Sequence, residues 1–168
     1  MDFFDFMIKK AIMNKIIEGK TKIRFQDCDP FNHLNNSKYI DYFVNVREDQ
    51  LIENYDFDYL NIAKTQGVGW VVGSNKISYL KSANLSEIVT IQSQIIQVTL
   101  KSTLVEFRMY NEAKTQLKSV MWSKFIHIDI KTMRSTQHSE KFMKLFKIIC
   151  LPVNENLFDE RVKAILKR

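Results

Sequence analysis

Residues 24–40, RFQDCDPFNHLNNSKYI, join an alternating segment to a long amphipathic one. Before them, apolar and polar side chains alternate from Thr21 to Gln26, which predicts a strand. After them, apolar side chains recur at helical spacing from about Ser37 to Asn54, which predicts a helix. The residues between are polar, and Pro30 disfavours helix at the position before it. The sequence therefore predicts a strand, a polar loop and a long helix, in that order.

The chain after this helix is rich in strand patterns. Four segments alternate or are dense in β-branched residues: 68–79, 87–100, 102–110 and 117–130. One helix cannot cover both faces of such a sheet, so we expect an α+β fold in which a curved antiparallel sheet wraps around the long central helix. An open edge of that sheet predicts a homodimer or a dimer of dimers.

The two ends of the chain have different patterns. Apolar positions at helical spacing over residues 1–18 predict an N-terminal helical extension, residues 1–19, that packs on the domain. We expect the main domain to span 20–148 and to end in a short helix near 139–148. Residues 149–168 are expected to form a polar C-terminal tail, and the stretch between residues 54 and 68 is expected to be irregular.

Length and cysteine content limit the class of protein. The 168 residues suit one domain, and no apolar run reaches the length needed to span a bilayer. Asp2, Asp5 and the absence of a small-residue cleavage site argue against a signal peptide. Cys28 and Cys150 give neither a disulfide framework nor metal-ligand spacing. We therefore expect a cytoplasmic protein without a metal.

The formal net charge of +6 raises the question of a polyanionic partner. Lys and Arg are scattered, with no block of five or more, so nucleic acid is not expected as a partner. A basic adaptor for nucleic acid or a membrane surface remains the weakest reading, and it predicts steeply salt-dependent binding.

Reactive side chains gather in the loop before the long helix. Asp27, Asp29, His33, Asn35 and Asn36 lie within ten residues. Helix N-terminal N–H groups favour developing negative charge, and a carboxylate beside them can act as nucleophile or general base. Asp and Asn also favour turns and helix caps for structural reasons alone. The residues by themselves leave both interpretations open.

Residues 24–40 resemble the signature of the 4-hydroxybenzoyl-CoA thioesterase-like branch of the hotdog-fold proteins. Weaker similarity continues at 77–83 (ISYLKSA) and 129–134 (DIKTMR), so the resemblance covers roughly residues 20–140. It implies a hotdog fold and hydrolysis of an acyl-CoA or acyl-carrier-protein thioester to free acid and thiol, a reaction of lipid metabolism. It implies no metal or redox cofactor.

The resemblance also implies residue roles. Asp29 would be the catalytic carboxylate, attacking the thioester or activating water. The backbone N–H of Asn36 would polarise the thioester carbonyl. His33 would orient Asp29, water or substrate. The remaining expected site residues contact substrate or support the loop: Asp27, Asn35, Tyr39 and Phe43, with Tyr42 as a further aromatic along the acyl tail.

Two positions depart from the family pattern. Asn32 replaces the usual glycine before the motif histidine, and asparagine tolerates the left-handed backbone better than most residues. Phe31 stands where plant-type enzymes carry a catalytic asparagine. These departures keep an alternative open, a non-catalytic hotdog module that binds an acyl thioester or a carrier protein.

Residues outside the motif receive structural interpretations. We expect His127 to be a sheet residue, His138 to lie on the surface, and Trp70 and Trp122 to belong to the core or to an interface. Lys81, Lys101 and Arg134 are interpreted as solvated strand ends, with coenzyme A phosphates as the alternative ligand.

Overall fold

The structure is a computed structural model that describes residues 14–167. Its strands are β1 (Ile17–Lys22), β2 (Val68–Tyr79), β3 (Ile88–Val98), β4 (Ser102–Asn111), β5 (Leu117–Asp129) and β6 (Arg134–Ser135). Its helices are α2 (Tyr39–Tyr55), α3 (Tyr59–Gln66), α4 (Glu140–Ile149) and α5 (Phe158–Leu166), with short 3₁₀ turns η1 (Phe25–Asp27) and η2 (Asn36–Lys38). Among the described residues, no helix is long and apolar enough to cross a membrane.

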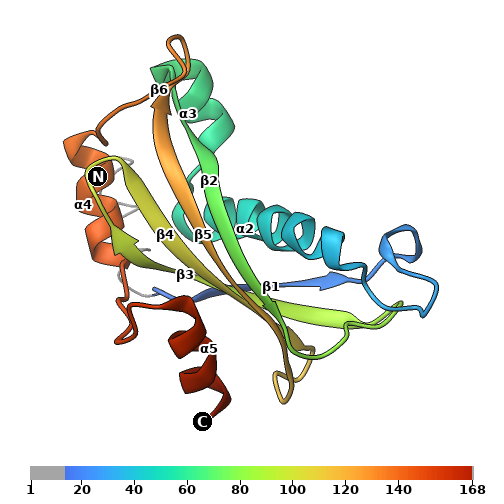
Figure 1. Ribbon diagram of the computed structural model, residues 1–168. Coiled ribbons are helices and arrows are strands. Elements are labelled where there is room, and N and C mark those ends of the chain that lie inside the picture. The colour runs from blue at the N-terminus through green and yellow to red at the C-terminus, as the bar shows by residue number, and fades with distance from the viewer. Residues whose placement is uncertain (1–13, 168) are drawn as a thin grey trace.

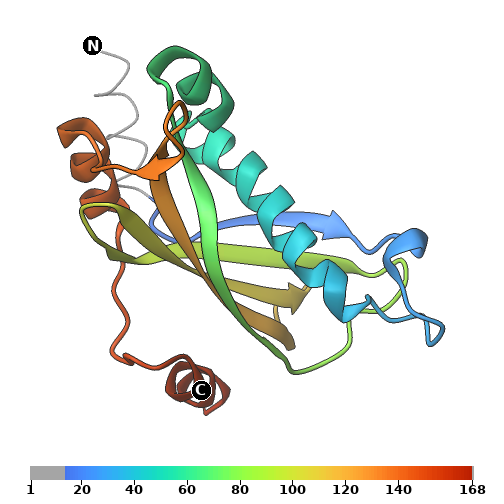
Figure 2. The same cartoon turned by 45° about the horizontal axis from the view of Figure 1, so that its top comes forward.

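One antiparallel sheet has the strand order β1-β3-β4-β5-β2, with β6 paired to β5. The sheet curls, and α2 lies along its concave side (Figure 1 and Figure 2). Phe43 of α2 is fully buried and packs on Phe107 of β4, with ring centroids 5.4 Å apart. The predicted hotdog fold, a curved antiparallel sheet wrapped around one long central helix, is confirmed.

Most predicted elements lie where the sequence places them. The four strands after α2, α2 itself and α4 begin and end within two residues of their predicted limits. The sheet is antiparallel throughout, and β2 pairs with β5 although nearly 40 residues separate them in sequence. That pairing makes β2 an edge strand of the sheet.

The first strand differs from its prediction. It covers Ile17–Lys22 rather than 21–26, and Phe25–Asp27 form a 3₁₀ turn. Residues 17 and 18, which were predicted to belong to the N-terminal helix, therefore belong to β1. Residues 1–13 of that predicted helix lie outside the described part of the chain. Gly19 explains the close packing of β1, because a Cβ there would lie 2.9 Å from Cγ1 of Val46 on α2.

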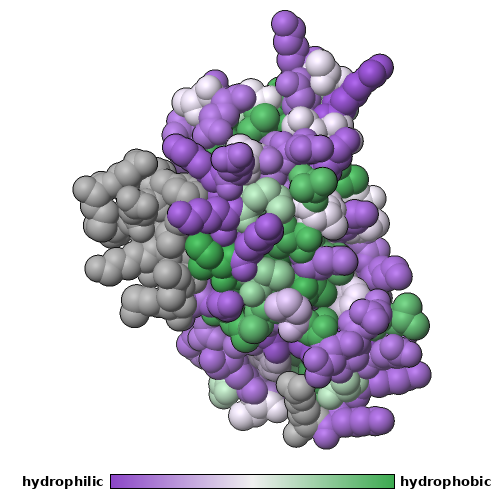
Figure 3. Space-filling view, turned by 90° about the vertical axis from the view of Figure 1, so that its left-hand side faces the viewer, coloured by the Kyte–Doolittle hydropathy of each residue, from purple (hydrophilic) through white to green (hydrophobic). Residues whose placement is uncertain are grey.

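Two helices occupy segments that were expected to be irregular. The Asp58 side chain caps α3 by accepting a 2.9 Å hydrogen bond from the Asn61 N–H, and Gly67 ends it at a φ of 67°. The expected polar tail contains α5, whose Phe158 and Val162 pack on the convex face of the sheet. Figure 3 views the side that carries α4 and α5, where hydrophobic surface is bordered by hydrophilic side chains.

The surface position expected for His138 is wrong. His138 is buried, and its Nε2 accepts a 3.2 Å hydrogen bond from Nε1 of Trp70. The His127 ring lies 4.7 Å from that of His138 and is buried in β5, as expected for a sheet residue. Trp70 packs against the core and Trp122 is buried under α5, which confirms their structural interpretation.

Candidate active site at the N-terminus of the central helix

The loop between η1 and α2 is folded around Asp29. Its Oδ1 accepts hydrogen bonds from the N–H groups of Phe31, at 2.9 Å, and His33, at 3.0 Å. The Asp29 N–H donates to the His33 carbonyl at 2.7 Å, which closes the loop on itself. Asn32 makes the reversal with a φ of 61°, the left-handed conformation that asparagine tolerates. The loop therefore holds the Asp29 carboxylate in a fixed position.

Asp27 fastens the loop to α2. The Tyr42 hydroxyl donates a 2.9 Å hydrogen bond to Oδ2 of Asp27 and accepts one of 2.9 Å from the Arg24 N–H. Burial raises the pKa of Tyr42, and the hydrogen bond to Asp27 adds to the increase because that carboxylate accepts the phenolic proton. The Asn35 N–H donates to the Asp27 carbonyl at 2.9 Å. Asp27 and Tyr42 thus tie the chain before the loop to the helix after it.

The helix start is capped by Asn35. Its Oδ1 accepts hydrogen bonds from the Ser37 N–H, at 2.9 Å, and from the Ser37 hydroxyl, at 2.8 Å. The chain then turns through η2 directly into α2. The first N–H groups of a helix have no acceptor within the helix, and Asn36 occupies that position. A helix N-terminus carries a partial positive charge.

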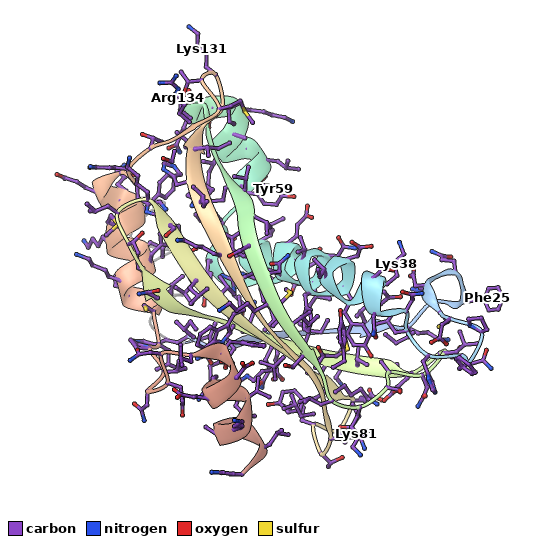
Figure 4. All side chains as sticks on the ribbon, viewed as in Figure 1. Phe25, Lys38, Tyr59, Lys81, Lys131 and Arg134 are labelled. Carbon is purple, nitrogen blue, oxygen red and sulfur yellow. The ribbon has the colours of Figure 1, made fainter. Side chains whose placement is uncertain are left out.

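A pocket of about 310 Å³ brings these groups together. Asp29, His33, Asn36 and Tyr39, four of the seven expected site residues, all line it. The structure does not bring the other three to the pocket: Asp27 bonds Tyr42, Asn35 caps the helix, and Phe43 is wholly within the core. The pocket also contains Lys81, which lies near the lower end of β2 in Figure 4.

Tyr79 is a pocket residue to which sequence reasoning gave no role. Its hydroxyl donates a 2.9 Å hydrogen bond to the Asn36 carbonyl, and its ring meets that of Tyr39 edge-on at 5.0 Å. Burial raises the pKa of Tyr39, so its hydroxyl stays protonated at neutral pH. The signal was present in the segment 77–83, which the family resemblance includes without assigning a function to its tyrosine.

The chain after β2 supports the loop. The Leu34 N–H donates to the Ala83 carbonyl at 2.8 Å, and the Ala83 N–H donates to the Tyr39 hydroxyl at 3.2 Å. The buried Lys118 donates to the Ser82 carbonyl at 2.7 Å and forms an ion pair with Glu87 at 2.9 Å. A lysine at the second position of a predicted strand gave no sign of this role, because its partners are distant in sequence.

Comparison with known proteins identifies the family of the chain. Residues 23–146 match the family model of the thioesterase-like superfamily, which is about three quarters of the chain. The chain is 27% identical over 119 residues to the long-chain acyl-CoA thioesterase FadM of Escherichia coli strain K12, which covers 71% of this chain and 88% of that one.

Solved structures have the same fold. YbaW from Escherichia coli aligns with a TM-score of 0.69 at 24% identity, over 80% of this chain and 99% of its own. The 1,4-dihydroxy-2-naphthoyl-CoA thioesterase Slr0204 from Synechocystis aligns with a TM-score of 0.70 at 9% identity, over 79% and 96%. Together with the family match, these similarities make the chain a member of the thioesterase-like superfamily, a hotdog-fold thioester hydrolase.

Proposed function

We propose that the protein hydrolyses an acyl-CoA, or the corresponding acyl-carrier-protein thioester, to the free acid and the thiol. The observation that carries the proposal is that the Asp29 carboxylate and the N-terminus of the central helix line one pocket. Similarity to FadM, a long-chain acyl-CoA thioesterase, supports coenzyme A as the carrier. No metal or redox cofactor has a part in this reaction.

In the proposed reaction, Asp29 acts on the thioester carbonyl. As a general base it takes a proton from water while the water oxygen bonds to the carbonyl carbon; as a nucleophile it bonds to that carbon itself. The carbon–sulfur bond then breaks, and the thiolate leaves and takes up a proton. In the nucleophilic variant, water afterwards hydrolyses the acyl-Asp29 anhydride.

The groups around Asp29 have supporting roles in this proposal. The Asn36 N–H, at the positive end of the helix, stabilises the oxyanion that develops on the carbonyl oxygen. His33, half-buried in the same pocket, orients the attacking water or the substrate. Lys81 at the pocket edge is the cation available to a coenzyme A phosphate.

We further propose that the protein acts as a homodimer through β2. This strand is an edge of the sheet, and Val71 and Val72 are exposed along it. An apolar edge strand presents backbone groups that a second copy can pair with. Phe31 beside Asp29 is 77% exposed, and Phe25 projects from the end of the same loop (Figure 4), so a partner subunit near the pocket would cover apolar surface. A dimer of dimers is the larger assembly compatible with this interface.

The expected setting is the reducing cytoplasm. Both cysteines, Cys28 and Cys150, are free thiols in the structure. Free thiols on partly exposed residues persist where glutathione and thioredoxin keep them reduced.

Thiol release from a panel of acyl-CoAs tests the reaction. We expect wild type to release thiol and Asp29→Asn to lose about 100-fold or more in kcat, equal to about 2.7 kcal/mol of transition-state stabilisation. Asp41→Asn, which replaces an exposed carboxylate in the first turn of α2, is the matched control and should keep wild-type kcat. Equal rates for wild type and Asp29→Asn would contradict the assignment of Asp29.

The alternative function, a hotdog module that binds acyl thioesters without hydrolysis, is tested in the same experiment. Phe31 favours it, because the asparagine of the plant-type enzymes is missing at that position. This alternative predicts acyl-CoA binding by wild type with no thiol release, from acyl-CoA or from acyl-carrier protein.

A further inference from the structure

A second cavity, of about 290 Å³, lies between α2 and the concave face of the sheet, away from Asp29. Its walls come from α2, α3, α4 and four strands, and most of its surface is apolar. Its volume is at the lower end of the range for small-molecule sites. Aromatic and aliphatic side chains dominate the lining: Leu51, Phe57, Trp70, Val105, Phe125 and Phe146. Tyr59, labelled in Figure 4, lies at the start of α3 and also lines the cavity.

One cation is present in this apolar lining. Arg47 of α2 is 7% exposed, and its Nη1 donates a 2.8 Å hydrogen bond to the Ser93 hydroxyl. No carboxylate of the described residues lies within ion-pair distance of its guanidinium. Burial lowers the pKa of Arg47 to about 10, so the side chain still carries its charge at neutral pH.

The other buried cations of the described chain have carboxylate partners. Arg161 places Nε and Nη2 on the two oxygens of Glu106, at 2.8 and 3.0 Å, and Lys118 pairs with Glu87 at 2.9 Å. A buried charge without a counter-ion is costly in free energy, and a guanidinium has five N–H donors to satisfy. Within residues 14–167, the guanidinium of Arg47 donates to Ser93 and has further N–H groups that a ligand can use.

We propose that this cavity binds an apolar chain that ends in a carboxylate, with the carboxylate on Arg47 and the methylenes against the aromatic side chains. A carboxylate accepts two parallel hydrogen bonds from a guanidinium, which a neutral chain end cannot match. Glu48 also lines the cavity, and its charge opposes entry of an anion, so the carboxylate must reach Arg47 past it. Tyr59 stands beside Glu48, and burial together with that carboxylate raises the pKa of Tyr59.

Two sources of such a ligand are compatible with the geometry. Arg47 follows Asn36 by eleven residues, or about 16 Å along the helix at 1.5 Å per residue. The carboxylate is then either the far end of a dicarboxylic acyl chain whose thioester lies at Asp29, an interpretation that rests on the proposed function, or the head of a free fatty acid. Both place the same group on the same guanidinium.

Binding is measured first, without catalysis. The chain has two tryptophans, so Trp122→Phe leaves Trp70, which lines the cavity, as the fluorescent reporter. We expect decanoate to change Trp70 fluorescence and to bind with an affinity about tenfold or more above that of decanol. In Arg47→Met, the affinity for decanoate should fall to that for decanol. Arg134→Met, which removes an exposed charge of the same kind, is the control and should bind decanoate like wild type.

Folding of the variant is checked in the same samples. Arg47 is a buried cation with no carboxylate partner among residues 14–167, so its replacement by an apolar side chain of similar length is expected to leave the melting temperature without ligand equal to or above that of wild type. Equal affinity for decanoate and decanol in wild type, or undiminished decanoate binding by a folded Arg47→Met, would overturn the proposal.

Hydrolysis then distinguishes the two sources. Coenzyme A monothioesters of dicarboxylic acids are compared with monocarboxylic thioesters of equal chain length. The carboxylate belongs to the substrate if wild type prefers the dicarboxylic series by about tenfold in kcat/KM and Arg47→Met abolishes this preference. Decanoate binding without that preference assigns it to a free acid. Absence of hydrolysis in both series contradicts the proposed function alone, since the binding measurement stands apart from it.

Discussion

The backbone N–H of His33 donates a 3.0 Å hydrogen bond to Oδ1 of Asp29, and the His33 carbonyl accepts one of 2.7 Å from the Asp29 N–H. This reciprocal pair closes residues 29–33 into a ring. The described residues place no hydrogen-bond donor on Oδ2, so that oxygen is available for the chemistry proposed here. The position of the carboxylate therefore depends on the backbone of residues 30–32.

Asn32 is the residue on which this loop depends, because its φ is 61°. We expect Asn32→Ala to destabilise the protein by roughly 1–2 kcal/mol, the cost of a left-handed backbone for a residue with a Cβ and no local hydrogen bond. Asn32→Gly, which has no such cost, should match or exceed wild-type stability and keep its kcat. Urea unfolding and thiol release measure the two effects. An alanine variant as stable and active as the glycine variant would show that the loop does not need this conformation.

Lys118 is expected to be a positioning residue for the pocket. Its side chain is 2% exposed and joins the Ser82 carbonyl to Glu87. Lys118→Met leaves both acceptors without their cation, at a cost of about 1–3 kcal/mol in the free energy of unfolding.

Steady-state kinetics separates positioning from folding for Lys118. Lys81 and Ser82 line the pocket, so we expect Lys118→Met to raise KM more than it lowers kcat, at a temperature where the variant is folded. Lys114→Met removes an exposed ion pair with Glu18 and should change stability by no more than about 1 kcal/mol. The idea fails if the two variants behave alike.

The docking of α5 rests on a buried ion pair. Arg161 contacts both oxygens of Glu106, which is fully buried and also accepts a 3.0 Å hydrogen bond from Nε1 of Trp122. Arg161→Met removes the bidentate partner of that buried carboxylate and leaves it only the longer ion pair with Arg108, whose Nε lies 3.6 Å from Oε1, so we expect a loss of about 3 kcal/mol. The double variant Glu106→Gln with Arg161→Met should recover most of the loss, as measured by denaturant unfolding. If the double variant is no more stable than the single one, packing of α5 and not charge accounts for the effect.

Stability is expected to fall in mild acid because of two buried histidines. Nδ1 of His138 lies 3.2 Å from the Thr99 carbonyl oxygen, and Nε2 accepts a hydrogen bond from Nε1 of Trp70. Because Nε2 is an acceptor, the ring is neutral. Burial, with a contribution from the nearby His127, lowers the pKa of His138 to about 4, and burial lowers the pKa of His127 too. The unfolded chain binds these protons near pH 6.5.

The sign follows from linkage between protonation and folding. A folded pKa below the unfolded one means that the full stability is present above about pH 6.5 and is lost as pH falls toward 4, by up to about 1.4 kcal/mol per pH unit for each histidine. Urea unfolding at several pH values between about 5 and 7 measures the slope. His138→Gln should reduce this slope, because only the contribution of His127 then remains.

The sequence was sufficient for β2, β3, β4, β5 and α2, because their patterns extend over ten or more residues. It was misleading where a pattern suited two structures. Ile16 and Ile17 continue the helical spacing of residues 1–12, yet Ile17 is fixed in β1 by pairing with Ser93, a contact that no local pattern reveals. Phe158 and Val162 looked like isolated apolar residues in a polar tail, and only the convex face of the sheet gives them a partner.

The candidate site was predicted in part for the same reason. Asp29, His33, Asn36 and Tyr39 are close in sequence, so their meeting in one pocket required only the loop and the helix start. Tyr79 and Lys118 reach the site from strands far along the chain. His138 was placed on the surface because it precedes a helix, whereas tertiary packing of Trp70 and Phe146 encloses it.

The pairing of β2 with β5 has a consequence for synthesis of the chain. The partner positions are separated by roughly 40–60 residues, so at about 5–20 residues per second β2 leaves the ribosome seconds before the strand it must pair with. During that time Trp70, Val71 and Val72 form an apolar, β-prone segment that could associate with another nascent chain. Gly69 and Gly73, both in β2, flank this segment, and glycine lowers the tendency of an isolated segment to form strand. The two glycines of the edge strand thus lower the tendency of the nascent segment to pair before β5 has been made.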